Sequence, residues 1–397
     1  MPVTRARGPS LLVWGLGATV IVGFGALLYG FSVLVTDQAA GAEFSTTVLS
    51  GAFGGAVLTG GLAGIFVGRW ADRRGVRSIV AIGSLAALVG MAGFAWARQP
   101  WQVLAAWWLV LGPAGAMVLY DPAFVALDQW FPRAERIRGI AALTFLGGLS
   151  GPIYLPATSA LVRSLGWRPT ALILGGAVAA VGLLTALVAI PPGRPLREET
   201  EGVARPIRHL IADRRFILFT AASFLVYGTL EAVLVHRVAR FEESGFPVAS
   251  VAAWAALAGI LSFPGRYLLP RLAIRVQGTR LFALTLVVMA ASLGLAVRGS
   301  ATWEMVAHFL AFGLVFGSVI PLRAVVMSDW FSGAAFGRVM GAQMAGIAVF
   351  RAIAPAVTGA LRDAQGSYLV PMALLTASVA VAAALMLAAE ARGTQPR

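Results

Sequence analysis

The sequence predicts an all-α membrane protein with twelve transmembrane helices, and three observations support this prediction. Hydrophobic residues make up 59% of the 397 residues and charged residues only 12%, about half the charged share of an average soluble domain. The mean hydropathy is +0.83. The apolar residues form long blocks of about 20 residues, the length that a helix needs to cross a bilayer. A soluble core would show shorter blocks with a polar face.

Each apolar block is expected to form one helix. The first block starts near Leu11 and is too long for the core of a secretory signal peptide, so it is expected to remain as the first helix. The other blocks follow one another with short polar segments between them. The expected spans are 11–35, 47–68, 76–97, 101–127, 138–162, 168–190, 216–240, 248–270, 279–298, 303–327, 338–361 and 368–390.

The arginines indicate how these spans are oriented. All 31 basic residues are arginine. When an arginine at the end of an expected span is counted with the adjoining segment, 21 lie on one side of the membrane, 6 on the other side and 4 inside spans. Cytoplasmic loops of membrane proteins carry the excess of basic residues. Both termini are therefore expected in the cytoplasm, and the chain is expected to be a multi-pass protein of the bacterial inner (plasma) membrane.

A polar stretch divides the chain into two halves of six helices. Residues 191–215 are rich in charge and are expected to be a cytoplasmic linker between an N-terminal bundle, 1–190, and a C-terminal bundle, 216–397. Short identities recur 200 residues apart at equivalent helix junctions, which indicates an internal repeat. The clearest are Trp130-Phe131 with Trp330-Phe331, Arg138 with Arg338, and Ala160-Leu161 with Ala360-Leu361.

Several classes of protein are excluded by residues that the sequence lacks. It has no cysteine, and its three histidines, His209, His236 and His308, share no metal-ligand spacing, so no metal site is expected. It has no lysine and no phosphate-binding loop, and no nucleophile–base motif, so neither an enzyme nor a cofactor is expected. The net charge of +14 lies between apolar blocks, which favours a lipid bilayer over nucleic acid as the partner.

The stretch Gly68-Arg69-Trp70-Ala71-Asp72-Arg73-Arg74-Gly75-Val76-Arg77 resembles the signature loop between helices 2 and 3 of the major facilitator superfamily. The resemblance implies the major facilitator fold, in which the aspartate meets a helix N-terminus and nearby arginines. It implies a cytoplasmic gate made of Gly68, Asp72, Arg73, Gly75 and Arg77. The alternative is that these charges only set the topology. The second half has Ile274 in place of the acid, so one such latch is expected.

Other segments resemble the monocarboxylate transporter branch, which includes oxalate:formate-type antiporters. The resemblance implies a secondary transporter, expected to be a monomer, that moves a small organic anion by alternating access, coupled to protons or a counter-anion. The segments are Tyr120-Asp121-Pro122, Trp130-Phe131-Pro132-Arg133, Gly147 to Pro152, Gly166-Trp167-Arg168, Gly265-Arg266 and the region of His236.

A proton-coupled drug or metabolite efflux antiporter of the same fold is the alternative function. Gly147-x-x-x-Gly151-Pro152 partly matches the helix 5 motif of such antiporters, but Leu155-Pro156 stands in place of the downstream glycine pair. The helix 4 arginine of many exporters is also absent. A receptor or enzyme is a third possibility, for which the sequence shows no signalling domain.

Ionisable residues inside spans are the candidate substrate ligands, because each costs about 2.5–3.5 kcal/mol on insertion scales. Arg266 and Arg351 match the basic residues that hold a dicarboxylate in oxalate:formate-type transporters, and guanidinium pairs bidentately with carboxylate. The alternative is a structural ion pair with Glu231 or Asp121. By the same resemblance, Tyr29, Tyr120 and Tyr154 line the cavity of the N-terminal half; packing is their alternative role.

Three further residues are candidates for proton coupling: Glu231, Asp121 and His236. Burial raises the pKa of a carboxyl group, and histidine titrates near neutral pH. Glu231 has the alternative role of neutralising a buried arginine, and Asp121 that of a packing charge. Arg323 is expected to extend its side chain to the membrane surface, and His308 to form a hydrogen bond at the surface near Glu304.

Overall fold

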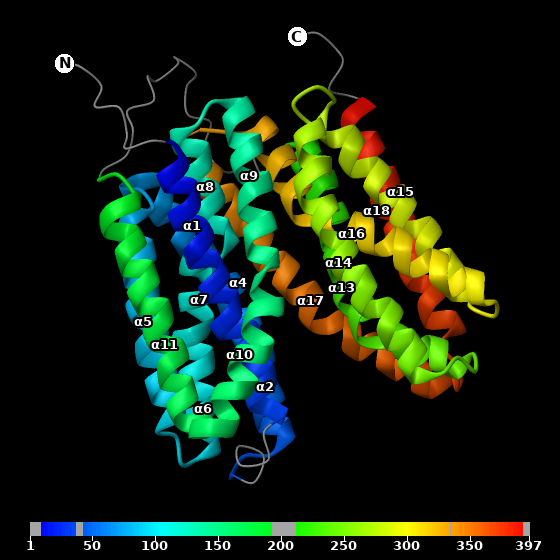
Figure 1. The fold of residues 1–397 in the computed structure, drawn as a ribbon. Coiled ribbons are helices and arrows are strands. Elements are labelled where there is room, and N and C mark those ends of the chain that lie inside the picture. The colour runs from blue at the N-terminus through cyan, green and yellow to red at the C-terminus, as the bar shows by residue number, and fades with distance from the viewer. Residues whose placement is uncertain (1–8, 37–42, 193–211, 334, 392–397) are drawn as a thin grey trace. The chain divides into compact units, whose positions relative to one another are not determined.

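The computed structural model describes residues 9–36, 43–192, 212–333 and 335–391, and every regular element in these ranges is a helix (Figure 1). Twelve of its helical spans are long and apolar enough to cross a membrane. The prediction of an all-α membrane protein with twelve transmembrane helices is therefore confirmed. The spans follow the predicted order, and the second, fifth and eleventh extend several residues beyond the predicted ends, to Thr47–Arg74, Arg133–Leu165 and Phe336–Gln365.

The described chain forms two compact units. The first comprises Met1–Ala204 and Phe331–Ala348; the second comprises Arg205–Trp330 and Val349–Arg397. The predicted division into two bundles of six helices remains a prediction, and residues 193–211 of the predicted linker lie outside the described residues.

The first unit contains six spans, of which four are assembled from consecutive helical segments. Its elements are α1 (Pro9–Phe24), η1 (Gly25–Gly30), α2 (Phe31–Thr36), α4 (Thr46–Arg74), α5 (Arg77–Ala95), α6 (Pro100–Ala105), η2 (Ala106–Leu111), α7 (Gly112–Val118), α8 (Tyr120–Trp130), α9 (Arg133–Gly148), α10 (Ser150–Leu165), α11 (Trp167–Leu184) and η3 (Thr185–Ala189), where η marks a π-helical turn.

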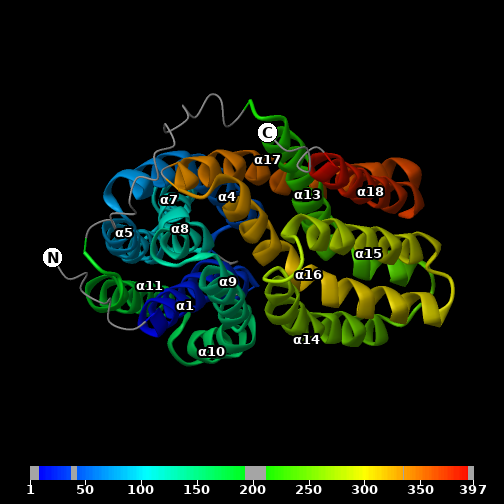
Figure 2. The same ribbon diagram turned by 90° about the horizontal axis from the view of Figure 1, so that it is seen from above.

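The second unit contains four complete helices, a fifth, α16, that lacks only its last residue, and more than half of a sixth. They are α13 (Arg214–Glu243), α14 (Val248–Leu272), α15 (Gly278–Arg298), α16 (Thr302–Phe331) and α18 (Leu369–Ala391), together with α17 (Phe336–Gln365) from Val349 onward. In this unit α15 packs against α18, and α18 packs against α13 (Figure 2).

Prolines determine where two spans of the first unit are interrupted. Leu119, between α7 and α8, has φ −89° and ψ −153°, which is outside the helical region. Pro122 follows it within the first turn of α8, where a missing N–H leaves no hydrogen bond unsatisfied. Pro152 likewise lies in the first turn of α10, just after the junction at Leu149. The interruptions therefore lie directly before the positions that cannot continue a helix.

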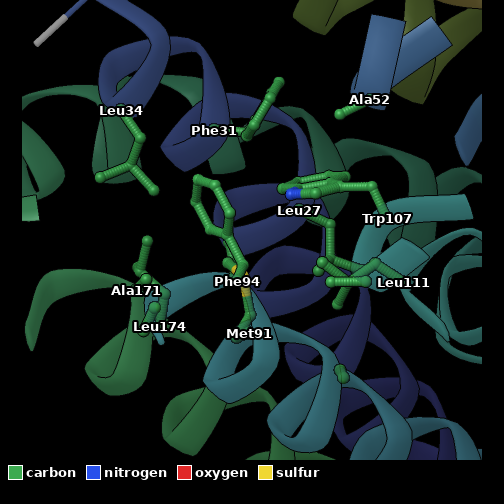
Figure 3. Close-up of a cluster of buried hydrophobic side chains, with 14 of the residues drawn as sticks. Leu27, Phe31, Leu34, Ala52, Met91, Phe94, Trp107, Leu111, Ala171 and Leu174 are labelled. Atoms are coloured by element: carbon green, nitrogen blue, oxygen red, sulfur yellow. The ribbon is translucent and has the colours of Figure 1, made fainter. Parts of the chain in front are cut away.

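Aromatic side chains fill the core of the first unit (Figure 3). The ring centroids of Phe31 and Trp107 lie 4.0 Å apart, and Phe94 lies 5.8 Å from Trp107. These three rings come from α2, η2 and α5, and Leu174 of α11 packs in the same cluster. The core thus ties together segments that are far apart in the sequence.

Glycines bring α14 and α16 of the second unit into backbone contact. A β-carbon on Gly265 would overlap the Leu314 carbonyl, and one on Gly317 would overlap the Ser262 carbonyl. Small residues are the usual means of close helix packing in a bilayer, where lipid is as apolar as leucine. The contact places Arg266, the residue after Gly265, next to α16.

Candidate functional site: charged residues in the membrane spans

The carboxylate of Asp72, at the end of α4, caps the start of α17. It accepts hydrogen bonds from the backbone N–H of Gly337 at 2.8 Å and of Arg338 at 2.9 Å, and from Arg338 Nε at 3.3 Å. The side chain is almost fully buried. The first N–H groups of a helix have no partner within the helix, and the dipole there favours a negative charge. Asp72 therefore supplies hydrogen-bond acceptors and a negative charge to the N-terminus of α17.

The other residues of the predicted gate differ in their surroundings. A β-carbon on Gly68 would overlap the Gly337 carbonyl, so this glycine allows α4 and α17 to touch. Gly75 ends α4 with φ 77°, a conformation that favours glycine. Arg77 reaches the Leu187 carbonyl at 3.5 Å, and Arg73 is exposed. The structure thus brings Gly68 and Asp72 to α17 and leaves Arg73 and Arg77 away from that contact.

A second charged cluster of the first unit was not predicted from the sequence. Arg136 Nη1 lies 2.6 Å from Asp128 Oδ1, and both side chains are at most 5% exposed. Asp128 Oδ2 accepts from the Gly333 N–H at 3.1 Å, and Arg136 donates to Ser332 Oγ at 3.1 Å. The pair joins α8 and α9 to the segment before α17. Nothing in the spacing of Asp128 and Arg136 distinguishes them from other charges at helix ends.

We expect Asp128→Ala to destabilise the protein, because removing one partner of a buried ion pair leaves an uncompensated charge and costs about 3 kcal/mol or more. The unfolding midpoint of the purified protein in detergent should fall clearly. The double variant Asp128→Ala/Arg136→Leu should regain part of the loss, since it leaves no unpaired charge. Equal midpoints for Asp128→Ala and the unaltered protein would contradict this account of the pair.

The three tyrosines proposed for the N-terminal half pack on glycines of neighbouring segments. A β-carbon on Gly151 would lie 3.1 Å from the Tyr29 ring, and one on Gly25 would overlap the ring of Tyr154. The Tyr120 hydroxyl fills the space that Gly147 leaves, and it lies 3.4 Å from the Thr144 carbonyl. The two glycines of Gly147-x-x-x-Gly151 thus make room for Tyr120 and Tyr29.

Arg351, one of the two predicted anion ligands, forms an ion pair with Glu231. Arg351 Nε lies 2.6 Å from Glu231 Oε1, and an Nη2 contact reaches the same oxygen. The two side chains, on α17 and α13, are 28% and 31% exposed. The ion-pair alternative considered for Arg351 is therefore formed in this structure, and one of the two carboxylate oxygens makes both contacts.

Arg266 has different surroundings from Arg351. Its guanidinium lies over the Phe316 ring of α16, 5.8 Å from the ring centroid. Its Nε is buried and, among the residues that the structure describes, it has no hydrogen-bond partner. Arg266 therefore keeps N–H donors that no group in the described part of the chain uses.

His236 bridges three helices. Its Nε2 lies 3.0 Å from the Pro355 carbonyl of α17, and its Nδ1 lies 3.1 Å from the hydroxyl of Tyr368, just before α18. A carbonyl only accepts, so Nε2 carries a proton. Burial raises the pKa of Tyr368, so its hydroxyl stays protonated at neutral pH and can donate to Nδ1.

Two sequence-based expectations about α16 are wrong. Arg323 does not extend to the membrane surface but is 1% exposed, with its guanidinium 5.7 Å from the centroid of the Tyr227 ring. His308 is fully buried, with its ring against Phe241 and Phe309. Helix α16 is enclosed by its neighbours along most of its length, so its polar side chains are held inside the unit. Asp121, in the first turn of α8, is partly buried.

No group of three histidine, aspartate or glutamate side chains in the described ranges could hold a metal ion. The arginines described above can bind an anion, and the carboxylates and histidines can carry a proton.

Comparison with known proteins identifies the family. A family model described as Major Facilitator Superfamily matches residues 13–312. The chain is 27% identical over 410 residues to monocarboxylate transporter 3 of Rattus norvegicus, which covers 96% of this chain and 81% of that protein. It is also 27% identical over 314 residues to monocarboxylate transporter 11 of Homo sapiens, covering 75% of this chain and 65% of that protein.

Solved structures match the fold. The human organic anion transporter MFSD10 (TETRAN) superposes with a TM-score of 0.77 at 15% identity, covering 96% of this chain and 100% of that one. FucP in the outward conformation gives a TM-score of 0.74 at 14% identity, covering 96% and 98%. At these identities the likeness shows the fold alone. With its twelve spans and the family match over residues 13–312, the chain belongs to the Major Facilitator Superfamily and is a multi-pass membrane transporter rather than an enzyme.

Proposed function

We propose that this transporter moves a small organic anion, a mono- or dicarboxylate, by alternating access. The observation that carries the proposal is an excess of positive charge deep in the second unit. Four arginines of its described spans, Arg237, Arg266, Arg323 and Arg351, lie more than three residues from a helix end, whereas Glu231 is the one acid at such a depth. An excess of positive over negative charge in a membrane is expensive, and an anionic solute would offset it.

The names of the relatives support the same solute class. The curated relatives include monocarboxylate transporters, and one structural neighbour is an organic anion transporter. We assign the anion to Arg266 and Arg351, with Tyr29, Tyr120 and Tyr154 contributed by the N-terminal half.

Coupling and gating complete the proposal. Glu231, Asp121 and His236 are the groups that would carry a proton, unless a counter-anion provides the driving gradient. Gly68, Asp72, Arg73, Gly75 and Arg77 would form the cytoplasmic gate, with Asp72 as its latch. Both termini would lie in the cytoplasm of a bacterial cell, and the transporter would act as a monomer.

Transport in proteoliposomes tests the proposed function. We expect uptake of radiolabelled oxalate, lactate or pyruvate, accelerated by a proton or counter-anion gradient. Efflux of a cationic dye without uptake of any of these acids would instead favour the proton-coupled drug or metabolite antiporter.

Arg266→Gln should lower carboxylate uptake at low substrate concentration by about tenfold or more. A charge-assisted hydrogen bond contributes about 1.5–3 kcal/mol, and each 1.4 kcal/mol is a factor of ten in affinity. Arg280→Gln is the matched control, because it removes one positive charge from the same unit at an exposed pair with Glu390. Equal losses in the two variants would show that general charge, rather than Arg266, supports transport.

A further inference from the structure

Arg237 is a cation inside a span and has no anionic partner among the residues that the structure describes. It lies on α13, six residues before the last residue of the helix, Glu243. Its guanidinium lies over the rings of Phe309 and Phe312 of α16, 5.4 Å and 5.2 Å from their centroids. Among the residues that the structure describes, this side chain makes no hydrogen bond and no ion pair.

Arg240, one helical turn further along α13, shows how an arginine is held for structural reasons. It donates to Ser244 Oγ at 2.5 Å, to the Val297 carbonyl at 2.8 Å and to the Arg298 carbonyl at 3.2 Å. These bonds tie the end of α13 to the end of α15. Arg237 has no comparable structural task.

The two phenylalanine rings do not satisfy Arg237. A cation over an aromatic face gains about 0.5–2 kcal/mol, but this contact leaves the five N–H donors of the guanidinium unused. Unused charged donors within a membrane are costly. A partner that accepts hydrogen bonds and carries negative charge would relieve this cost.

A second polar group at the same two rings has one ring nitrogen without a partner among the described residues. His308 contacts Phe309 and Phe312, with ring centroids 5.1 Å and 5.5 Å away. Its Nδ1 lies 2.9 Å from the Ser292 carbonyl, so Nδ1 carries the proton of the neutral ring. Its Nε2 is buried and, within the described ranges, accepts no hydrogen bond. The surroundings thus hold unused donors and an unused acceptor.

These groups lie along one face of α16. Phe309, Phe312 and Phe316 are three and then four residues apart, the spacing of side chains on one face of a helix. Phe312 and Phe316 stack with centroids 5.7 Å apart. Arg237 lies over the first two rings and Arg266 over the third. From Phe309 to Phe316 the helix rises about 10 Å. The two arginines with unused donors therefore lie along the same aromatic face, separated by a distance of that order.

We propose that Arg237 is a second binding position for a carboxylate group, separate from the position at Arg266 and Arg351. A carboxylate can pair with the guanidinium through two parallel hydrogen bonds while the rings of Phe309 and Phe312 cover the opposite side of the cation. The buried Nε2 of His308 only accepts, so it would bind a hydroxyl or protonated acid group of the same solute rather than the carboxylate. The inference rests on the proposed function in that the ligand is taken to be the transported anion.

Equilibrium binding of radiolabelled oxalate to the purified full-length protein tests the assignment. We expect the unaltered protein to show two classes of binding. Arg237→Gln should lose one class and keep the other, Arg266→Gln should do the reverse, and the double variant should lose both. Arg237→Lys should retain the second class with an affinity about tenfold weaker, since it keeps the charge without the planar fork. Arg280→Gln should bind as the unaltered protein does.

The outcomes separate the inference from the proposed function. If the unaltered protein transports carboxylates but Arg237→Gln binds oxalate with unchanged stoichiometry and affinity, the second position is refuted and the proposed function stands. If the unaltered protein neither transports nor binds any of the acids, both fail. Unfolding midpoints measured in parallel show whether each variant is folded. If Arg237→Gln is not folded, the binding of oxalate to Arg237→Lys decides whether the second position exists.

Discussion

Arg351→Ala is expected to lower oxalate affinity at the position shared with Arg266 by about 100-fold or more, while Glu231→Gln binds oxalate there at least as tightly as the unaltered protein. In the structure, Glu231 occupies Arg351 with a carboxylate, the same group that a substrate would present. If Glu231 competes with the substrate for Arg351, removing the charge of Glu231 leaves the Arg351 guanidinium available to the substrate. Two charge-assisted hydrogen bonds of about 1.5–3 kcal/mol each account for the expected loss when Arg351 is removed.

A purely structural ion pair predicts a different pattern. Removing either partner would then leave a charge alone in the membrane span and would damage the protein, whereas removing both would restore it. Similar losses in Arg351→Ala and Glu231→Gln, with recovery in Arg351→Ala/Glu231→Ala, would therefore refute the role of Arg351 in binding. The partial exposure of both side chains is consistent with a pair that can exchange partners.

Asp72→Ala is expected to release the start of α17 from α4 and to slow transport by about tenfold or more. The substitution removes the acceptor for the N–H groups of Gly337 and Arg338 and for Arg338 Nε. Hydrogen bonds to a charged group contribute about 1.5–3 kcal/mol each, and a net change of about 3 kcal/mol shifts a two-state equilibrium by about 100-fold. A transporter held in one state by this shift cannot complete its cycle efficiently.

Cysteine labelling can follow this release directly, because the chain contains no cysteine of its own. Ala345 of α17 is buried and packs against Gly61 of α4. In the variant Ala345→Cys, a thiol reagent should react about tenfold faster or more when Asp72→Ala is added. Asp72→Asn should give an intermediate rate, since it keeps one acceptor oxygen and loses the charge.

Arg74→Ala is the control for the latch. Arg74 lies in the last turn of α4, two residues after Asp72, and is exposed. If the charges of this loop only set the topology, Asp72→Ala should label and transport as Arg74→Ala does. That result would remove Asp72 from the gate.

The sequence alone predicted the helical spans well, because the physical rule behind them is local. A segment that crosses a bilayer must satisfy its backbone hydrogen bonds internally and must be apolar over about 20 residues. Both properties depend only on consecutive residues, so all twelve spans could be predicted in order. The loop from Gly68 to Arg77 indicated the family for a similar reason. Its motif is defined by residue types and spacings within ten consecutive positions.

The partners of charged side chains could not be predicted in the same way. The sequence offered Glu231 as one of two possible partners of Arg351, and only the structure shows that these residues, 120 positions apart, form the pair. It gave no indication that Asp128 pairs with Arg136, or that Arg240 is bonded to carbonyl groups while Arg237 lies over two rings. Arg323 and His308 were expected at the surface and are buried.

The reason is geometric. The sequence of this protein determines which segments are helices in the membrane, whereas the rotation of each helix about its axis decides what its side chains face. That rotation depends on packing between segments distant in the chain, such as the backbone contact of Gly265 and Gly317 between α14 and α16. Tertiary structure therefore decided which cations have partners, and with it where an anion can bind.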